Sequence, residues 1–279
     1  MTSLQRIIKY CAVALAIFLI VSIIGGICGA IGMLSGFFGG WAAGKEAIGE
    51  MRTYAVSGPV ESLDMEIGAA ALDIVTGDRF SVESNHKYLS VKEENHTLKI
   101  SEEKIPFDFS SEGVTVVLTV PEGFVFEDAS IETGAGKVDI DALCANTLSL
   151  DLGAGETVIG TLSSLTRAKI NTGAGKLVIR AGQLNDLTLD HGVGKLELTG
   201  ALTGSCDVDF GVGGADITLL GSREDYQIRL DKGLGDATLD GQAMSDGSTY
   251  GGGANRIEID GGVGSIQIQF KDAGESDHA

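Results

Sequence analysis

The chain has 279 residues, with 39 acidic and 20 basic side chains and a formal net charge of −19 at pH 7. Residues 1–45 contain no acid and three basic side chains, so the rest of the chain carries 17 basic and 39 acidic residues, a net charge of −22. This excess of acidic side chains excludes a general nucleic-acid-binding protein, whose affinity depends on basic side chains that neutralise phosphates.

An uncharged stretch of 35 residues, 10–44, follows the N-terminal residues 1–9. Its segment 11–31 is apolar and long enough to span a hydrocarbon core about 30 Å thick. Because Arg6 and Lys9 precede it, the positive-inside rule places residues 1–9 in the cytoplasm. We expect a single-pass transmembrane anchor in the cell membrane, with the C-terminal domain extracellular; a cleaved signal peptide is the alternative.

Glycines recur every three or four residues in the second half of this stretch, at Gly25, Gly29, Gly32, Gly36 and Gly40. Small residues at that spacing allow two helices to approach closely in a membrane. The other interpretation is a glycine-rich extension that ends the anchor and begins a flexible stalk.

Residues 45–57 are predicted to be a polar linker, and residues 58–130 an irregular part that caps the repeats. Residues 62–78 resemble a degenerate repeat in which Ala70 replaces the second glycine. The end units of a repeat protein have to shield its open core, which is the role expected for residues 58–130.

A phrase of the form GxG recurs along residues 131–270, as in TGAGKVDI, LGAGETVI, TGAGKLVI and HGVGKLEL. The copies are 19, 20, 19, 19, 22 and 29 residues apart. Apolar and polar side chains alternate on both sides of each GxG, which is the pattern of half-buried strands. We predict an all-β fold, a parallel β-helix or solenoid of repeats with about 20 residues each, in which strand, GxG corner, strand and return turn follow one another. A meander of antiparallel hairpins is the alternative.

The corner glycines are expected to adopt positive φ, which only glycine tolerates without strain. The residue between them is expected to pack under the corner. The corner glycines are Gly134, Gly136, Gly153, Gly155, Gly173, Gly175, Gly192, Gly194, Gly211, Gly213, Gly233, Gly235, Gly262 and Gly264.

Residues 241–255 account for the longest spacing between corners. We interpret them as an extruded loop, either a tolerated insertion or a recognition loop with Tyr250 as its contact residue. Residues 271–279 are predicted to be a disordered tail.

A mostly acidic column lies two residues before each first glycine, and Glu66 is its degenerate member. In stacked coils this column becomes an outward ladder of carboxylates, which either binds Ca²⁺ weakly through oxygen ligands or forms a solvated acidic face. Lys137, Lys176 and Lys195 are placed to neutralise part of it. No other metal, cofactor or catalytic residue is predicted. The column consists of Glu132, Asp151, Asn171, Asp190, Asp209, Asp231 and Asp260.

Three segments follow one another along the chain: EIGAAALDIVTGD, TLKISEE and VTVVLTVPEGFVFEDASIETGAGKVDI. In sequence and order they resemble the bacterial "putative adhesin" family, a domain of unknown function that includes the LiaG-like cell-envelope stress proteins. The resemblance covers about residues 56–270. It implies a β-solenoid displayed outside the membrane and assigns no catalytic or binding residue.

The resulting hypothesis is a membrane-anchored acidic β-solenoid that acts as an adhesin-like interaction or sensing scaffold of the cell envelope. Its expected partners are the membrane and either an envelope polymer or a membrane protein, and not nucleic acid. One alternative is an accessory subunit of an envelope-stress membrane complex. Another is a polysaccharide-acting β-helix enzyme with two ladder acids as acid and base. The regular column marks out no such pair, so a non-enzymatic role is preferred.

Overall fold

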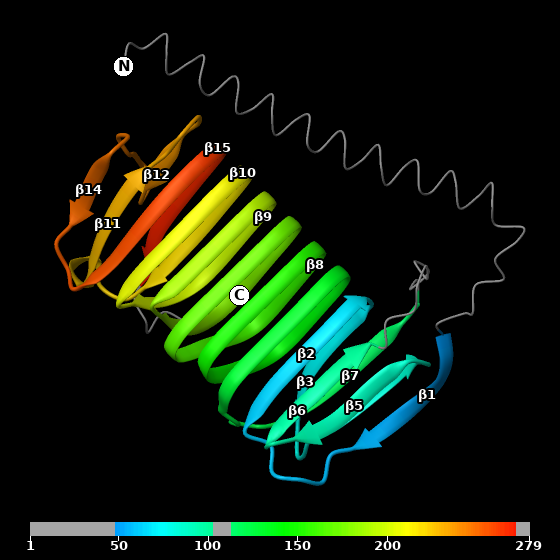
Figure 1. Ribbon diagram of the computed structural model, residues 1–279. Coiled ribbons are helices and arrows are strands. Elements are labelled where there is room, and N and C mark those ends of the chain that lie inside the picture. Colours follow the sequence, from blue (N-terminus) through cyan, green and yellow to red (C-terminus); the bar gives the residue numbers. More distant parts are fainter. Residues whose placement is uncertain (1–47, 103–112, 272–279) are drawn as a thin grey trace, which may run out of the picture. The chain divides into compact units, whose positions relative to one another are not determined.

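Strands make up almost all of the regular structure in residues 48–102 and 113–271, which the computed structural model describes. All of them belong to one 15-stranded sheet, which is wound into a solenoid (Figure 1). The predicted all-β, solenoid-like fold is confirmed. In chain order the elements are β1 (Ile48–Ala55), β2 (Ser62–Ala69), β3 (Ala71–Gly77), β4 (Ser81–His86), β5 (Leu89–Glu94), β6 (Thr97–Glu102), β7 (Thr115–Pro121), β8 (Phe126–Asn185), β9 (Leu187–Thr203), β10 (Ser205–Leu220), the 3-10 helix η1 (Arg223–Asp225), β11 (Tyr226–Asp231), β12 (Ala237–Leu239), β13 (Gln242–Ala243), β14 (Ser248–Gly251) and β15 (Asn255–Lys271).

Successive coils pair in parallel through the middle of the solenoid. β8 passes through three GxG corners as one strand, and β9 and β10 add the next two. The pairing aligns equivalent repeat positions, so that Gly175 lies beside Gly194 and Gly194 beside Gly213. An antiparallel meander therefore does not describe this part of the chain.

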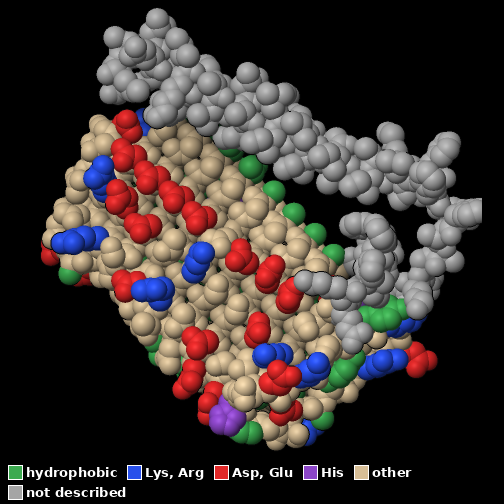
Figure 2. All heavy atoms as spheres, viewed as in Figure 1, with side chains coloured by type: hydrophobic (Ala, Val, Ile, Leu, Met, Phe, Trp, Pro, Cys, Tyr) green, Lys and Arg blue, Asp and Glu red, His purple; other side chains and the backbone are tan. Residues whose placement is uncertain are grey.

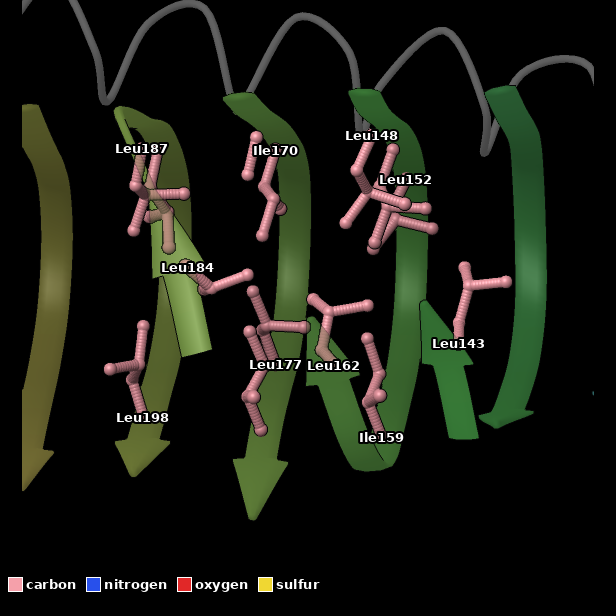
Figure 3. Close-up of a cluster of buried hydrophobic side chains, with 14 of the residues drawn as sticks. Leu143, Leu148, Leu152, Ile159, Leu162, Ile170, Leu177, Leu184, Leu187 and Leu198 are labelled. Atoms are coloured by element: carbon pink, nitrogen blue, oxygen red, sulfur yellow. The ribbon is translucent and has the colours of Figure 1, made fainter. Parts of the chain in front are cut away.

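Inward side chains of each coil stack in columns and form the core. The columns predicted on the two sides of the corner are buried, as Leu189 and Leu198 illustrate with exposed fractions of 0% and 1%. A third column comes from the return segments, where the sequence predicted only turns. It contains Leu143, Leu162 and Leu184, each at most 2% exposed (Figure 3). Burial of each such leucine contributes roughly 1.5–3 kcal/mol.

The two glycines of each corner are needed for different reasons. The second glycine of each corner has a positive φ, between 137° and 146°, as predicted. Of the first glycines only Gly233 has a positive φ. The others allow close approach between coils: a Cβ on Gly192 would lie 2.3 Å from the carbonyl oxygen of Gly173.

The order of the coils in the stack differs from their order in the chain. β15, the last strand, lies between β10 and β11 and pairs in parallel with both. At the other end β2 lies between β6 and β8, and β3 lies between β7 and β8. The path of paired strands therefore ends at β1 on one side and at β14 on the other, and the last strand, β15, lies inside the stack (Figure 1).

Antiparallel strands cover both ends of the solenoid. β1 pairs with β4 at one end, and β14 pairs with β11 at the other. Residues 48–55 thus form a strand where the sequence predicted a linker over 45–57. Six of the eight side chains of β1 are exposed, so no apolar alternation marked it as a strand.

Residues 241–255 fold onto the end of the solenoid instead of forming an extruded loop. They include β13, β14 and the start of β15, and Tyr250 packs against the core. The Tyr250 hydroxyl accepts a hydrogen bond from the backbone N–H of Ser245 at 2.8 Å. The prediction of an extruded loop is wrong, because this segment covers the edges of β11 and β12.

The predicted anchor over residues 10–44 lies outside the described residues, as do residues 1–9 and residues 272–279 of the predicted tail. Lys271 is the last residue of β15. Within residues 48–102 and 113–271 no helix is long and apolar enough to cross a membrane.

Candidate functional site: an acidic ladder beside the glycine corners

The acidic column predicted from the sequence forms a continuous ladder across the solenoid. Asn171 pairs in register with Asp190, and Asp190 with Asp209. Because β15 is inserted, Asp209 is followed by Asp260 and only then by Asp231. At the other end Glu66 lies beside Glu132. Neighbouring parallel strands are about 4.8 Å apart, so these side chains stand close together on one face.

Figure 2 shows acidic side chains in rows across this face of the solenoid. Asn171 replaces an acid at one position of the ladder. Its amide Nδ2 donates a hydrogen bond to Asp151 Oδ1 at 3.1 Å, so these two neighbours attract each other, whereas two carboxylates would repel. At the far end Arg229 lies 3.4 Å from Asp231. Asp190, Asp209 and Asp260 lie side by side between these two points.

The lysines that follow the corners pair with a different set of acids. Lys137 contacts Asp139 at 3.2 Å, and Lys176 contacts Glu197 at 3.3 Å. Lys195 bridges Glu197 at 2.7 Å and Asp216 at 3.3 Å. These acids lie on the strand after the corner, on the other side of it from the ladder. The expectation that the lysines neutralise the ladder is therefore wrong.

Partial burial and crowding of like charges raise the pKa of two carboxyls at the centre of the ladder. Partial burial raises the pKa of the Asp209 carboxyl, and its hydrogen bond with Asp190 and the charges of Asp190 and Asp260 raise it further. Partial burial and the charge of Asp231 also raise the pKa of Asp260, while Arg229 acts in the opposite direction. This face would therefore gain electrostatic stability from a bound positive charge.

Two open hollows follow the ladder on its corner side. The larger has a volume of about 660 Å³ and is lined by Asp190, Asp209, Asp260 and the neighbouring glycines. The smaller, about 360 Å³, is lined by Glu132, Asp151 and Asn171. Because the corner glycines have no side chains, there is room beside the carboxylates. The ladder therefore borders a shallow groove that runs along the stack.

The ladder does not form a chelating metal centre. In the part of the chain that the structure describes, no three or more His, Cys, Asp and Glu side chains converge so that they could hold a metal ion. A regular row places each carboxylate beside its neighbours rather than around one point, whereas Ca²⁺ takes six to eight oxygen ligands. Weak calcium binding remains a prediction, in the form of loosely held counterions along the row.

The residues between the two corner glycines point outward. Ala135, Ala154 and Ala174 are exposed, and Leu234 is 40% exposed. Val193, Val212 and Val263 are half-buried, and none of the seven middle residues is buried, so the expectation that they pack under the corner is wrong. Figure 2 shows a row of such hydrophobic side chains along one edge of the solenoid.

One interior polar residue, His191, lies directly behind the ladder and was not identified as special from the sequence. It is 3% exposed and stacks on Phe210, with ring centroids 5.4 Å apart. Its Nδ1 is 2.6 Å from the Thr172 hydroxyl, while its buried Nε2 has no hydrogen-bond partner. Burial lowers the pKa of His191.

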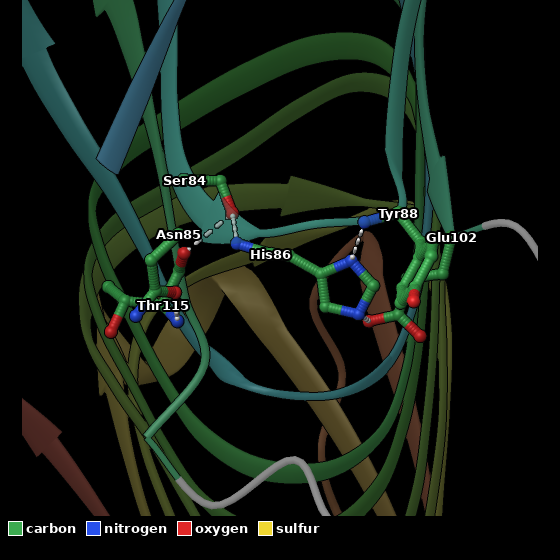
Figure 4. Close-up of polar contacts among 6 residues, drawn as sticks. All are labelled: Ser84, Asn85, His86, Tyr88, Glu102 and Thr115. Atoms are coloured by element: carbon green, nitrogen blue, oxygen red, sulfur yellow. Dashed lines mark hydrogen bonds and ion pairs between the residues drawn. The ribbon is translucent and has the colours of Figure 1, made fainter. Parts of the chain in front are cut away.

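A second buried polar cluster lies in the N-terminal cap (Figure 4). The Ser84 hydroxyl donates to the Thr115 carbonyl and accepts from the His86 N–H. The Tyr88 N–H donates to His86 Nδ1, which leaves Nε2 facing Glu102 at 4.0 Å. Because the Ser84 hydroxyl contacts backbone groups and the ring contact of His86 is made with Tyr88, this is not a nucleophile–base pair.

The fold and this face define a class of protein: an all-β solenoid with a regular acidic face. Comparison with known families makes the class specific, because the model of the Toastrack DUF4097 family matches residues 59–255. The chain belongs to the Toastrack DUF4097 family. A comparison with curated proteins gave no significant match.

Solved structures that are similar to this chain include three bacterial proteins. One is described as a putative cell adhesion protein from Clostridium sporogenes, with 17% identity, a TM-score of 0.37, and coverage of 80% of this chain and 99% of that one. A second is described as a putative adhesin from Bacteroides fragilis, with 18% identity, a TM-score of 0.38, and coverage of 78% and 96%. A third, described as a putative lipid binding protein from Parabacteroides distasonis, has 17% identity, a TM-score of 0.27, and coverage of 81% and 94%.

Proposed function

We propose that this protein is an adhesin-like interaction scaffold of the cell envelope, and that the acidic ladder is its binding face. The observation that carries the proposal is the central run Asp190, Asp209 and Asp260, which lies in register across three paired coils, while the nearby lysines form ion pairs with other acids. Partial burial and neighbouring carboxylates raise the pKa of the Asp209 and Asp260 carboxyls, which supports a surface that favours a positive partner.

An acidic row can bind in two ways. It attracts a cationic polymer or protein directly, and it attracts an anionic polymer when divalent cations bridge the two. Both modes use many weak, equivalent contacts, which suits a repeat protein whose face has a constant spacing. A general acid–base pair instead needs two carboxyl groups set apart for different roles, whereas each of these carboxylates occupies the same register position of its coil.

The anchor belongs to this proposal. The uncharged residues 10–44, preceded by Arg6 and Lys9, would hold the protein in the cell membrane with residues 1–9 in the cytoplasm. The solenoid would then stand outside the cell, close to the envelope. Proteolysis of intact cells tests this arrangement: we expect residues 48–271 to be cleaved from outside, and complete protection until lysis would contradict it.

The binding proposal is tested with the fragment 47–279, which forms a compact unit. The purified fragment is incubated with isolated cell envelopes, once with calcium and once with a chelator. Retention that the chelator abolishes indicates cation bridging to an anionic partner, and retention unaffected by the chelator indicates a cationic partner. No retention in either condition would contradict the proposed function.

A further inference from the structure

The C-terminal segment of the solenoid is a separately paired unit that docks through one strand. β11 pairs with β14 and β15, and β12 pairs with β13 and β15. In the described chain, β15 is the only strand of residues 226–271 that pairs with an earlier strand, β10. Residues 226–271 therefore form one unit, and the seam between β10 and β15 attaches it.

The seam is long and matched at every position. β10 and β15 are in register from Ser205 beside Arg256 to Leu220 beside Lys271. Inward residues meet inward residues, as with Val208 and Ile259, and the corners coincide. Inside the seam the Tyr226 hydroxyl donates to the Leu220 carbonyl at 2.7 Å.

The covalent link across the seam is short and lies at the surface. Only residues 221–225 connect β10 to the unit, and they contain the exposed η1. Five extended residues span at most about 18 Å. While the seam is open, β10 and β15 each present an unpaired parallel edge with the repeat's own register, and such an edge pairs with any matching strand.

The best-matching strand is the same edge of another copy. We propose that two copies of this chain exchange residues 226–271, so that β15 of each docks onto β10 of the other and residues 221–225 act as the hinge. The exchange reproduces every contact of the seam in the partner, which is the condition for domain swapping at little energetic cost. The outer ends offer no comparable route, because antiparallel strands cover both of them, β1 at one end and β13 and β14 at the other.

The test uses full-length chains that each carry a single cysteine, in a background with the four native cysteines replaced by alanine. One copy carries Asp207→Cys and the other carries Glu258→Cys, two positions that pair across the seam. Paired positions on adjacent strands are close enough for a disulfide. The two copies are unfolded together, refolded in a mild detergent at increasing concentration, oxidised and separated on a non-reducing gel.

The matched control combines Asp207→Cys with Thr188→Cys, which pair across β9 and β10 on the same side of the hinge. We expect a disulfide-linked heterodimer of the first pair that increases with concentration and exceeds that of the control. Equal amounts from both pairs would mean random collision and would overturn the proposal. If a seam variant fails to fold by circular dichroism, Asp216→Cys with Gln267→Cys replaces it, with Asp216→Cys and Glu197→Cys as its control.

Discussion

At the scale of single residues, His191 shows how an interior position can make the solenoid sensitive to pH. The same column holds Leu152 in an earlier coil and Phe210 in the next, so an apolar side chain fits there. His191 instead leaves Nε2 buried without a partner. A neutral imidazole is tolerated in this place, whereas a protonated one would bring an unpaired charge into the core.

The sign of the pH effect follows from the direction of the shift. Burial lowers the pKa of folded His191 below 6.5, so the unfolded chain binds the proton first as the pH falls. Stability is therefore lost as the pH falls below about 6.5. We expect His191→Leu to reduce this loss, measured as the urea midpoint of residues 47–279 between pH 7 and pH 5. An identical slope for both proteins would contradict the assignment.

A corner glycine offers a second test at this scale. Gly194 has φ +140°, and a Cβ there would lie 1.7 Å from the carbonyl oxygen of Gly175. Because both the conformation and the space exclude a side chain, Gly194→Ala should lower the free energy of unfolding by more than about 1 kcal/mol. Gly252→Ala is the control, since a Cβ there meets nothing within 4 Å. Similar urea midpoints for the two variants would show that the corners are not built as described.

At the scale of elements, the register of each strand decides which side chains are inside. Leu189 is buried and its neighbour Asp190 faces solvent. Leu189→Asp places an unpaired carboxylate in the core and should cost at least about 3 kcal/mol. Asp190→Ser should leave the fold intact. Circular dichroism during thermal unfolding distinguishes them, and equal tolerance of both changes would refute the strand register.

The inserted strand makes a further prediction at this scale. β15 covers β10 on one side and holds β11 and β12 on the other. A chain that ends at residue 254 should therefore lose β11–β14 as ordered structure and expose the β10 edge. We expect amide protons of β11 to exchange rapidly in this variant while those of β8 stay protected. Protected β11 amides in the truncated chain would contradict the stacking order.

At the scale of the whole molecule, the sequence predicted the parts that repeat. Alternation around each GxG identified the buried columns that include Leu189 and Leu198, and the acidic column that forms the ladder. The third column was missed because each return segment contributes few inward residues, too few to show alternation. A leucine nine to eleven residues after the first glycine, as at Leu143, Leu162 and Leu184, was the available signal.

The stacking order could not be predicted, since every coil carries the same edge pattern. No local sequence feature indicates that β15 is inserted beside β10 instead of stacking at the end of the solenoid after β12. The end strand β1 carried no alternation, and the salt bridges of Lys195 depend on acids brought near only by stacking. What the sequence misses is therefore non-local pairing.

The measurement that tests the central claim compares two variants of residues 47–279 with equal changes in charge. One removes the ladder charges with Asp190→Asn, Asp209→Asn and Asp260→Asn. The other removes three acids of the lysine-paired set with Asp139→Asn, Glu197→Gln and Asp216→Asn. We predict that the first loses retention on cell envelopes while the second keeps it. Equal retention of the two variants would contradict the ladder as the binding face.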